Sequence, residues 1–204
     1  LGENTLIIFT SDNGGIEKWS QLEPLRGEKG SLFEGGVRIP AFMRWTGTIA
    51  PGSENHTPIT SVDYLPTFAK LAGAALPQTQ PVDGVDITPL MKGQAIPERS
   101  IFWHYPLYLD GRGLKLAMAD GTEYSWRGFP STSLRWGDYK LLHNYETGEL
   151  LLYNLVEDPG ETKNLASVLP HIANQLKAEM TAWVESTGAP IPTTPNPKFI
   201  GFAK

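Results

Sequence analysis

Two neighbouring oxygen-bearing side chains, Asp12 and Asn13, stand directly after an apolar run at residues 5–10. A carboxylate and an amide carbonyl are hard donors that suit Ca²⁺ or Mg²⁺ and suit soft metals poorly. Open α/β sheets bind ligands beyond the carboxyl ends of their strands, which is where this pair falls. Because Asn13-Gly14 is also a common tight-turn dipeptide, the pair alone leaves a metal site and a simple turn both open.

A polar, glycine-rich segment follows and carries Lys29, Arg26 and Arg38. An ammonium group can stabilise negative charge that builds up on an anion in a transition state, although by itself Lys29 is read as an ordinary solvated lysine. The two arginines could clamp an anion. We prefer pairing with the loop carboxylates Glu28 or Glu34, because such pairing is common.

The elements that must position these residues indicate an α/β fold. Residues 5–10 are almost continuously apolar, as in a strand that is buried on both faces of a mostly parallel sheet. Residues 41–45 and 101–103 have the composition of further strands. A helix is expected after Asp63, which can cap it, with Pro66 in its first turn.

The C-terminal part has a different pattern. Periodicity disappears over residues 105–132, which indicates an insertion or lid. Short apolar runs separated by glycine turns then predict an antiparallel meander over residues 134–153, and apolar residues recur at helical spacing from Leu169 to Gly188. We therefore expect three parts: 1–132, the end of an α/β domain; 133–188, a small α+β subdomain with an antiparallel sheet and one helix; and 189–204, a Pro-rich extended tail.

Composition excludes several classes of protein. Seventeen basic against 22 acidic residues give a net charge of −5, which offers no electrostatic footprint for nucleic acid or an anionic membrane. The 204 residues contain no cysteine, so the chain has no disulfide and no cysteine nucleophile. No apolar run reaches the roughly 18–20 residues of a membrane span, and no signal peptide is recognisable. We expect neither a nucleic-acid partner nor a membrane span.

Several motifs follow one another in order. They are Ser-Asp-Asn-Gly-Gly at 11–15, Arg-Gly-Glu-Lys at 26–29, Glu-Gly-Gly-Val-Arg-Ile-Pro at 34–40, Ser-Val-Asp-Tyr-Leu-Pro-Thr at 61–67, Phe-Trp-His-Tyr-Pro at 102–106, Gly-Asp-Tyr-Lys-Leu at 137–141, Leu-Tyr-Asn-Leu at 152–155 and Asp-Pro-Gly-Glu at 158–161. Each motif is moderately specific. The ordered set, which extends over residues 5–166, resembles the C-terminal half of a type I sulfatase.

The resemblance implies an alkaline-phosphatase-like α/β fold and hydrolysis of a sulfate ester, on an aryl group or a carbohydrate, by a formylglycine. The family makes that group from the first residue of Cys/Ser-x-Pro-x-Arg. No such motif occurs here, so the nucleophile is expected in a missing N-terminal half of the same protein, and this chain alone is expected to be inactive.

The resemblance also implies individual roles. Asp12 and Asn13 match the second pair of ligands for the divalent cation, expected to be Ca²⁺ with Mg²⁺ as the alternative. Lys29 matches the lysine that contacts the sulfate group. Such enzymes are periplasmic, secreted or lysosomal, and their substrates are sulfated small molecules or glycans.

His104 stands between Trp103 and Tyr105 and has two interpretations. It lines a substrate cleft, or it is a hydrogen-bonded histidine in an aromatic cluster. Two alternative functions also remain: a phosphohydrolase or phosphomutase of the same superfamily, and a non-catalytic carbohydrate- or metal-binding module if the chain is complete. A fragment would expose the surface of the strand at residues 5–10 and associate in solution.

Overall fold

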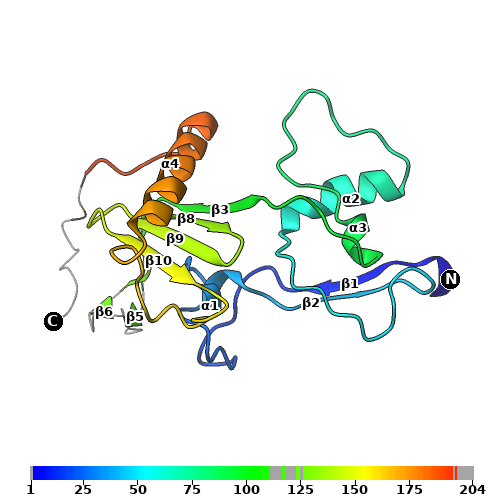
Figure 1. Ribbon diagram of the computed structural model, residues 1–204, viewed down its shortest axis with the longest axis horizontal. Helices are drawn as coiled ribbons and strands as arrows, with labels where there is room; N and C mark the ends of the chain where they lie inside the picture. Colours follow the sequence, from blue (N-terminus) through cyan, green and yellow to red (C-terminus); the bar gives the residue numbers. More distant parts are fainter. Residues whose placement is uncertain (1, 111–115, 118–122, 125, 195, 197–204) are drawn as a thin grey trace. The chain divides into compact units, whose positions relative to one another are not determined.

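The computed structural model describes residues 2–110, 116–117, 123–124, 126–194 and 196 (Figure 1). Its contacts divide the chain into two compact units. The first comprises Leu1–Thr10 and Pro40–Glu98, and the second comprises Ser11–Ile39 and Arg99–Lys204. The sequence-based boundaries at 132 and 188 remain a prediction. The contacts group residues 11–39, which carry the candidate site, with the C-terminal sheet.

The first unit contains a two-stranded antiparallel sheet, in which β1 (Ile7–Thr10) pairs with β2 (Ala41–Arg44) and Phe9 faces Phe42. The predicted strands are confirmed. The expectation that the first is buried in a mostly parallel sheet is not met within this chain, because Phe9 is 61% exposed and every pairing among the described residues is antiparallel. In the described part of the chain β2 is the one strand paired with β1, and Ile7 and Phe9 of β1 are at least half exposed while Ile8 is half-buried.

Three further helical segments belong to the first unit besides the 3₁₀ turn Gly2–Asn4. They are a 3₁₀ turn, η2 (Ser61–Asp63), and the helices α2 (Tyr64–Leu71) and α3 (Thr88–Met91). The Asp63 carboxylate is fully buried and accepts hydrogen bonds from the backbone N–H groups of Thr60 at 2.8 Å and Val85 at 3.0 Å. The predicted helix is confirmed, but the Asp63 side chain makes no capping hydrogen bond to it and instead joins Thr60 to Val85, in the segment that precedes α3.

The second unit is built on a four-stranded antiparallel sheet of order β10-β9-β8-β3. Its strands are β3 (Ser100–Tyr105), β8 (Ser131–Trp136), β9 (Tyr139–Asn144) and β10 (Leu150–Asn154). The predicted meander is therefore confirmed, and β3 joins it by pairing with β8.

Short strands also occur between β3 and β8. These are β4 (Leu109–Asp110) paired with β7 (Trp126–Gly128), and β5 (Leu116–Ala117) paired with β6 (Glu123–Tyr124). The predicted lid at residues 105–132 lies partly outside the described residues.

The helix α4 (Pro170–Thr187) packs against one face of this sheet (Figure 1). Leu176 and Met180 of the helix are buried in one cluster with Leu134, Leu141 and Leu152 of the strands. Gly188 follows with φ 62°, the left-handed conformation in which glycine commonly ends a helix. The predicted C-terminal helix is confirmed.

The opposite face of the sheet holds the segment that carries the candidate site. Successive strand residues point to opposite faces. Leu142, Leu151 and Tyr153 accordingly form a second cluster, with Phe33 and Phe129. Phe33 precedes a one-turn helix, α1 (Glu34–Val37), which the sequence did not predict as a helix. The segment at residues 11–39 is thereby anchored to a rigid sheet.

Described residues of the Pro-rich tail, Pro190 and Asn196, form hydrogen bonds with the second unit. The Pro190 carbonyl lies 2.9 Å from His104 Nε2, and the Asn196 N–H donates to Glu146 Oε1 at 2.9 Å. Residues 195 and 197–204 of the predicted tail lie outside the described residues. Among the described residues, no helix has the length and apolar character needed to cross a membrane.

Candidate functional site

Asp12 and Asn13 lie in a turn that follows β1 in the chain. The Ser11 hydroxyl donates to the Asn13 carbonyl at 2.9 Å, and Asn13 Nδ2 donates to the Gly14 carbonyl at 2.9 Å. The Asp12 side chain is exposed and Asn13 is half-buried. Since the nitrogen end of the Asn13 amide is engaged with the backbone, its oxygen is the candidate ligand atom of this side chain.

Close packing of glycines joins this turn to α1. The Gly14 N–H donates to the Gly36 carbonyl at 2.9 Å, and a Cβ at Gly14 would lie 1.9 Å from the Gly35 carbonyl oxygen. A Cβ at Gly35 would in turn lie 2.1 Å from the Gly27 carbonyl oxygen. Real side-chain atoms never approach that closely, so only glycine permits the three backbone segments to meet here.

Lys29 is brought to the same turn through its backbone. Its N–H donates to the Gly15 carbonyl at 2.8 Å, while its side chain is exposed. The neighbouring Glu28 is buried. One of its carboxylate oxygens accepts from the Glu17 N–H at 2.9 Å, and the other lies 2.8 Å from Arg127 Nε. The structure thus holds the backbone of Lys29 beside the Asp12-Asn13 turn and leaves its ammonium group in solvent.

The donor set at this turn fits part of a divalent cation site. A carboxylate and an amide oxygen on adjacent residues are the donor types that Ca²⁺ and Mg²⁺ prefer, but Ca²⁺ takes six to eight oxygens. Within the described ranges, no cluster of three or more acidic, histidine or cysteine side chains could hold an ion by itself. Asp12 and Asn13 therefore offer donors of the type that a divalent cation prefers, but they are too few to complete its ligand set.

His104 is engaged by its own chain through both ring nitrogens. Nδ1 lies 2.8 Å from the Thr132 hydroxyl oxygen, and Nε2 lies 2.9 Å from the Pro190 carbonyl oxygen, to which it must donate. The ring also contacts Tyr145 and Trp183 edge-on or tilted. These contacts favour the interpretation of a hydrogen-bonded histidine in an aromatic cluster.

The two arginines differ. Arg38 Nη1 lies 4.0 Å from a Glu34 carboxylate oxygen, as preferred from the sequence. Arg26 instead donates to the Tyr153 hydroxyl at 3.2 Å and to the Glu161 carbonyl at 2.9 Å. Burial raises the pKa of the Tyr153 phenol, and the charge of Arg26 opposes that change. Arg26 therefore anchors the segment to the sheet.

The sequence patterns did not predict a buried ion cluster that Lys140 forms with Glu34 and Glu161. Lys140 of β9 is fully buried, with its Nζ 2.9 Å from Glu34 Oε1 and 3.1 Å from Glu161 Oε1. Burial raises the pKa of the Glu161 carboxyl, and the nearby ammonium of Lys140 opposes that change. The only available signal was that all three residues fall within the ordered motifs.

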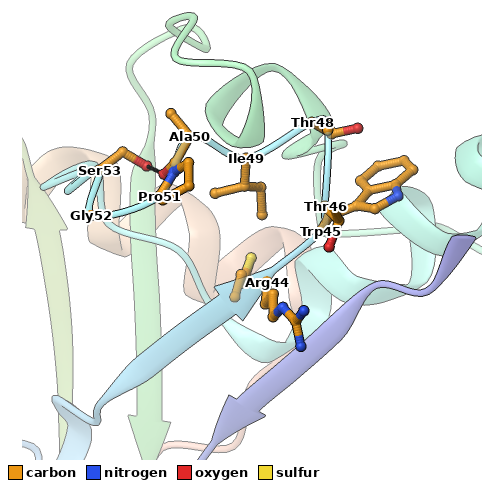
Figure 2. A pocket seen from close by; sticks show the side chains of 11 residues that line it. Arg44, Trp45, Thr46, Thr48, Ile49, Ala50, Pro51, Gly52 and Ser53 are labelled. Atoms are coloured by element: carbon orange, nitrogen blue, oxygen red, sulfur yellow. Dashed lines mark hydrogen bonds between the residues drawn. The ribbon is translucent and has the colours of Figure 1, made fainter. Parts of the chain in front are cut away.

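Figure 2 shows a surface hollow in the first unit, lined by residues 43–53, which comprise the end of β2 and the segment after it. Arg44 is its one charged side chain, and no carboxylate or histidine lines it. Its side chains therefore supply no ligand set for a divalent cation, and the candidate site stays with the turn that bears Asp12 and Asn13.

Comparison with known families identifies one that matches most of the chain. A model of the family described as N-sulphoglucosamine sulphohydrolase, C-terminal, matches residues 27–186. The chain belongs to the sulfatase family. The match spans the Lys29 segment, the four-stranded sheet and nearly all of α4, so this sulfatase chain corresponds to the C-terminal part of the family's fold.

Named relatives give the same result. The chain is 34% identical over 201 residues to a sulfatase of Formosa agariphila, which covers 93% of this chain and 34% of the relative. It is 37% identical over 191 residues to arylsulfatase A of Homo sapiens, covering 87% of this chain and 37% of that protein. The sulfatase chain thus spans about a third of the length of these relatives.

A solved structure confirms the fold class. The protein Ps i-CgsB, in complex with k-i-k-neocarrahexaose, matches with a TM-score of 0.69 and 26% identity over 89% of this chain and 37% of the solved chain. The α/β sulfatase fold with its C-terminal antiparallel sheet and helix is therefore shown for this sulfatase chain.

Proposed function

We propose that the protein containing this chain hydrolyses sulfate esters, and that this chain supplies Asp12, Asn13 and Lys29 to its active site. The observation that carries the proposal is the hydrogen bond from the Lys29 backbone N–H to the Gly15 carbonyl, which holds the backbone of a cationic residue beside a turn bearing two hard oxygen donors. The family match over residues 27–186 supports it.

The roles follow from the chemistry of the side chains. Asp12 and Asn13 hold a divalent cation, which we propose to be Ca²⁺, together with ligands from outside this chain. The cation supplies Lewis-acid polarisation of the sulfate oxygens. Lys29 places an ammonium charge beside the same group, where it stabilises negative charge that develops on sulfate or on the leaving oxygen. The sulfatase family's formylglycine nucleophile is expected in the part of the protein outside this chain.

The proposed substrate is a sulfated glycan. Ps i-CgsB, a relative in fold at 26% identity, was solved with an oligosaccharide, k-i-k-neocarrahexaose. An aryl sulfate is the alternative, since arylsulfatase A matches at 37% identity. For the location of the protein we propose the periplasm, the lysosome or the extracellular space, by analogy with the family.

The proposed partner of this chain is the remaining, N-terminal part of a sulfatase. Ile7, Phe9 and Phe42 lie on one face of the β1-β2 pair and are 50%, 61% and 65% exposed. Leu65 and Phe68 of α2 are 52% and 47% exposed. Exposed apolar patches of this kind mark surfaces that another element covers.

A substitution at Lys29 tests the proposal in the full-length protein. Lys29→Ala should lower kcat for a sulfate monoester roughly 100-fold, the usual cost of losing one group that stabilises charge in the transition state. Lys18→Ala is the matched control, because it removes another exposed lysine of the same segment and should leave kcat unchanged. Steady-state hydrolysis of matched sulfate and phosphate esters gives the measurement. Faster phosphate turnover would instead indicate the alternative phosphohydrolase function.

A further inference from the structure

A lysine and two carboxylates are sealed together beneath the site-bearing segment. Lys140, Glu34 and Glu161 are 0%, 1% and 0% exposed, and the Lys140 ammonium contacts both carboxylates. Burying charges is unfavourable unless they are paired and hydrogen-bonded, and a well-packed apolar group would often be at least as stable. Stability alone therefore does not account for this cluster, and its connections indicate another purpose.

The cluster contacts the segment around Lys29 at both of its ends, at Glu34 and at Arg26. At one end, Glu161 Oε2 accepts the Glu34 backbone N–H at 2.6 Å, at the first residue of α1. At the other end, the Glu161 carbonyl accepts a hydrogen bond from Arg26 Nη1 at 2.9 Å. Glu161 itself has φ 51°, an uncommon backbone conformation for this residue type that lets one residue serve both contacts.

Backbone hydrogen bonds continue from α1 to the proposed site. The Gly35 N–H donates to the Arg26 carbonyl at 2.7 Å, and the Gly36 carbonyl accepts from Gly14, the residue after Asn13. The last contact is the hydrogen bond that the Lys29 N–H donates to the Gly15 carbonyl. The chain of contacts from β9 to the Asp12-Asn13 turn is thus short, continuous and made of main-chain atoms after Glu34.

We propose that Lys140 and Glu161 are positioning residues, which hold α1 so that Asn13 and Lys29 keep their mutual placement without touching the substrate themselves. The inference deepens the proposed sulfatase function and rests on it for the meaning of that placement. One part of the proposal concerns structure alone: the buried cluster controls the backbone at Gly14 and Lys29. This part does not depend on any enzymatic activity.

Amide hydrogen exchange on the full-length protein tests this control. Lys140→Met removes the cation with little change in volume, and Glu161→Gln is a second, milder variant that keeps the shape. Exchange is followed at the Gly14 and Lys29 amides, which bond to Gly36 and Gly15, and at the Leu152 amide of β10 as an internal reference.

Leu176→Ala is the matched destabilising control. Leu176 is fully buried on α4, which packs on the sheet face opposite to α1, so its loss weakens the unit without touching the ion cluster. We expect both cluster variants to speed exchange at Gly14 and Lys29 at least tenfold relative to Leu152. Leu176→Ala, which loosens the cluster that also holds Leu152, should not raise that ratio. If all three amides accelerate equally in the cluster variants, the cluster only stabilises the fold and the proposal is overturned.

Turnover of a sulfate ester, measured on the same samples, separates the two proposals. The cluster variants should lower kcat roughly 10- to 100-fold, as losses of supporting partners around metal ligands typically do. If the cluster variants show the exchange effect but the wild-type protein hydrolyses no sulfate ester, the positioning role is kept and the sulfatase function is rejected. An active wild-type protein whose variants show no selective exchange effect would reject the positioning role alone.

Discussion

At the scale of single residues, the candidate site depends on glycines, because their lack of a Cβ leaves room for neighbouring backbone atoms. Gly14 and Gly35 allow carbonyl groups to occupy the space of a Cβ, and this closeness places Asn13 beside α1. Asp12 and Lys29 then contribute charge from exposed positions whose backbones are fixed. The candidate ligands are therefore positioned mainly by their glycine neighbours.

Substitution of Gly14 should show this dependence. Gly14→Ala would place a methyl group 1.9 Å from the Gly35 carbonyl oxygen, so the turn must shift, and we expect a loss of about 3 kcal/mol in the free energy of unfolding. Gly2→Ala, at a position with open space around it, should change that free energy by less than about 0.5 kcal/mol. Urea denaturation of the full-length protein measures both. Equal values for the two variants would contradict the packing argument.

At the scale of elements, the two faces of the four-stranded sheet pack against different parts of the chain. One face holds α4 through leucine and methionine side chains, and the other holds the site segment through Phe33, Arg26 and the ion cluster around Lys140. Strand β9 contributes to both, because alternate residues point to opposite faces.

The ring of His143 on β9 should make stability depend on pH. Burial, with Lys177 as a smaller repulsive cause, lowers the pKa of His143 below 6.5. The unfolded chain therefore binds the proton first, and the free energy of unfolding falls as pH drops through about 6.5.

His143→Phe should flatten this dependence, because it keeps an aromatic ring against Tyr145 and removes the titration. Denaturation at about pH 7.5 and about pH 5.5 gives the measurement, and a tenfold difference in proton affinity between the folded and unfolded chains corresponds to about 1.4 kcal/mol. His171→Gln, at an exposed position of α4, is the control and should leave the dependence as in the wild type. An unchanged slope in His143→Phe would contradict the assignment.

Sequence patterns predict those elements whose signals are local. Pro170 and Gly188 delimit α4, and glycine turns separate the strands of the meander, so both could be predicted. The helix α1 could not, because its four residues include two glycines and it is held by contacts with Lys140 and Glu161, which lie more than a hundred positions away.

In the candidate site, too, only the features with local sequence signals could be predicted. The types of Asp12, Asn13 and Lys29 indicate their chemistry, and the ordered motifs gave them roles. Nothing local marks Lys140 as buried, since lysine is almost never fully buried unless it is paired. The two contacts of His104 are equally remote in sequence, at Thr132 and Pro190.

At the scale of the whole molecule, the first unit leaves an apolar face uncovered. Phe9 and Phe42 are neighbours across the β1-β2 pair, with ring centroids 6.0 Å apart, and both are more than half exposed. A two-stranded sheet is marginal in water unless a further layer covers it. We therefore expect the isolated chain to associate through this face.

Sedimentation velocity of the isolated chain over a range of concentrations tests this expectation. The wild-type chain should form larger species as concentration rises, and Phe42→Lys should shift the distribution to the monomer by placing charge in the patch. Val156→Lys, at a site 69% exposed in the second unit, is the control and should behave as the wild type. A wild-type chain that stays monomeric throughout would show that the face needs no partner.

The main-chain bonds that join Gly14 to Gly36 and Lys29 to Gly15 have a consequence for protein engineering. Because backbone atoms define the turn, the exposed side chains near it in sequence, such as Lys18 and Trp19, can be randomised without rebuilding it. A library at those positions would therefore vary the exposed surface near the turn in sequence while the backbone hydrogen bonds of the turn stay in place.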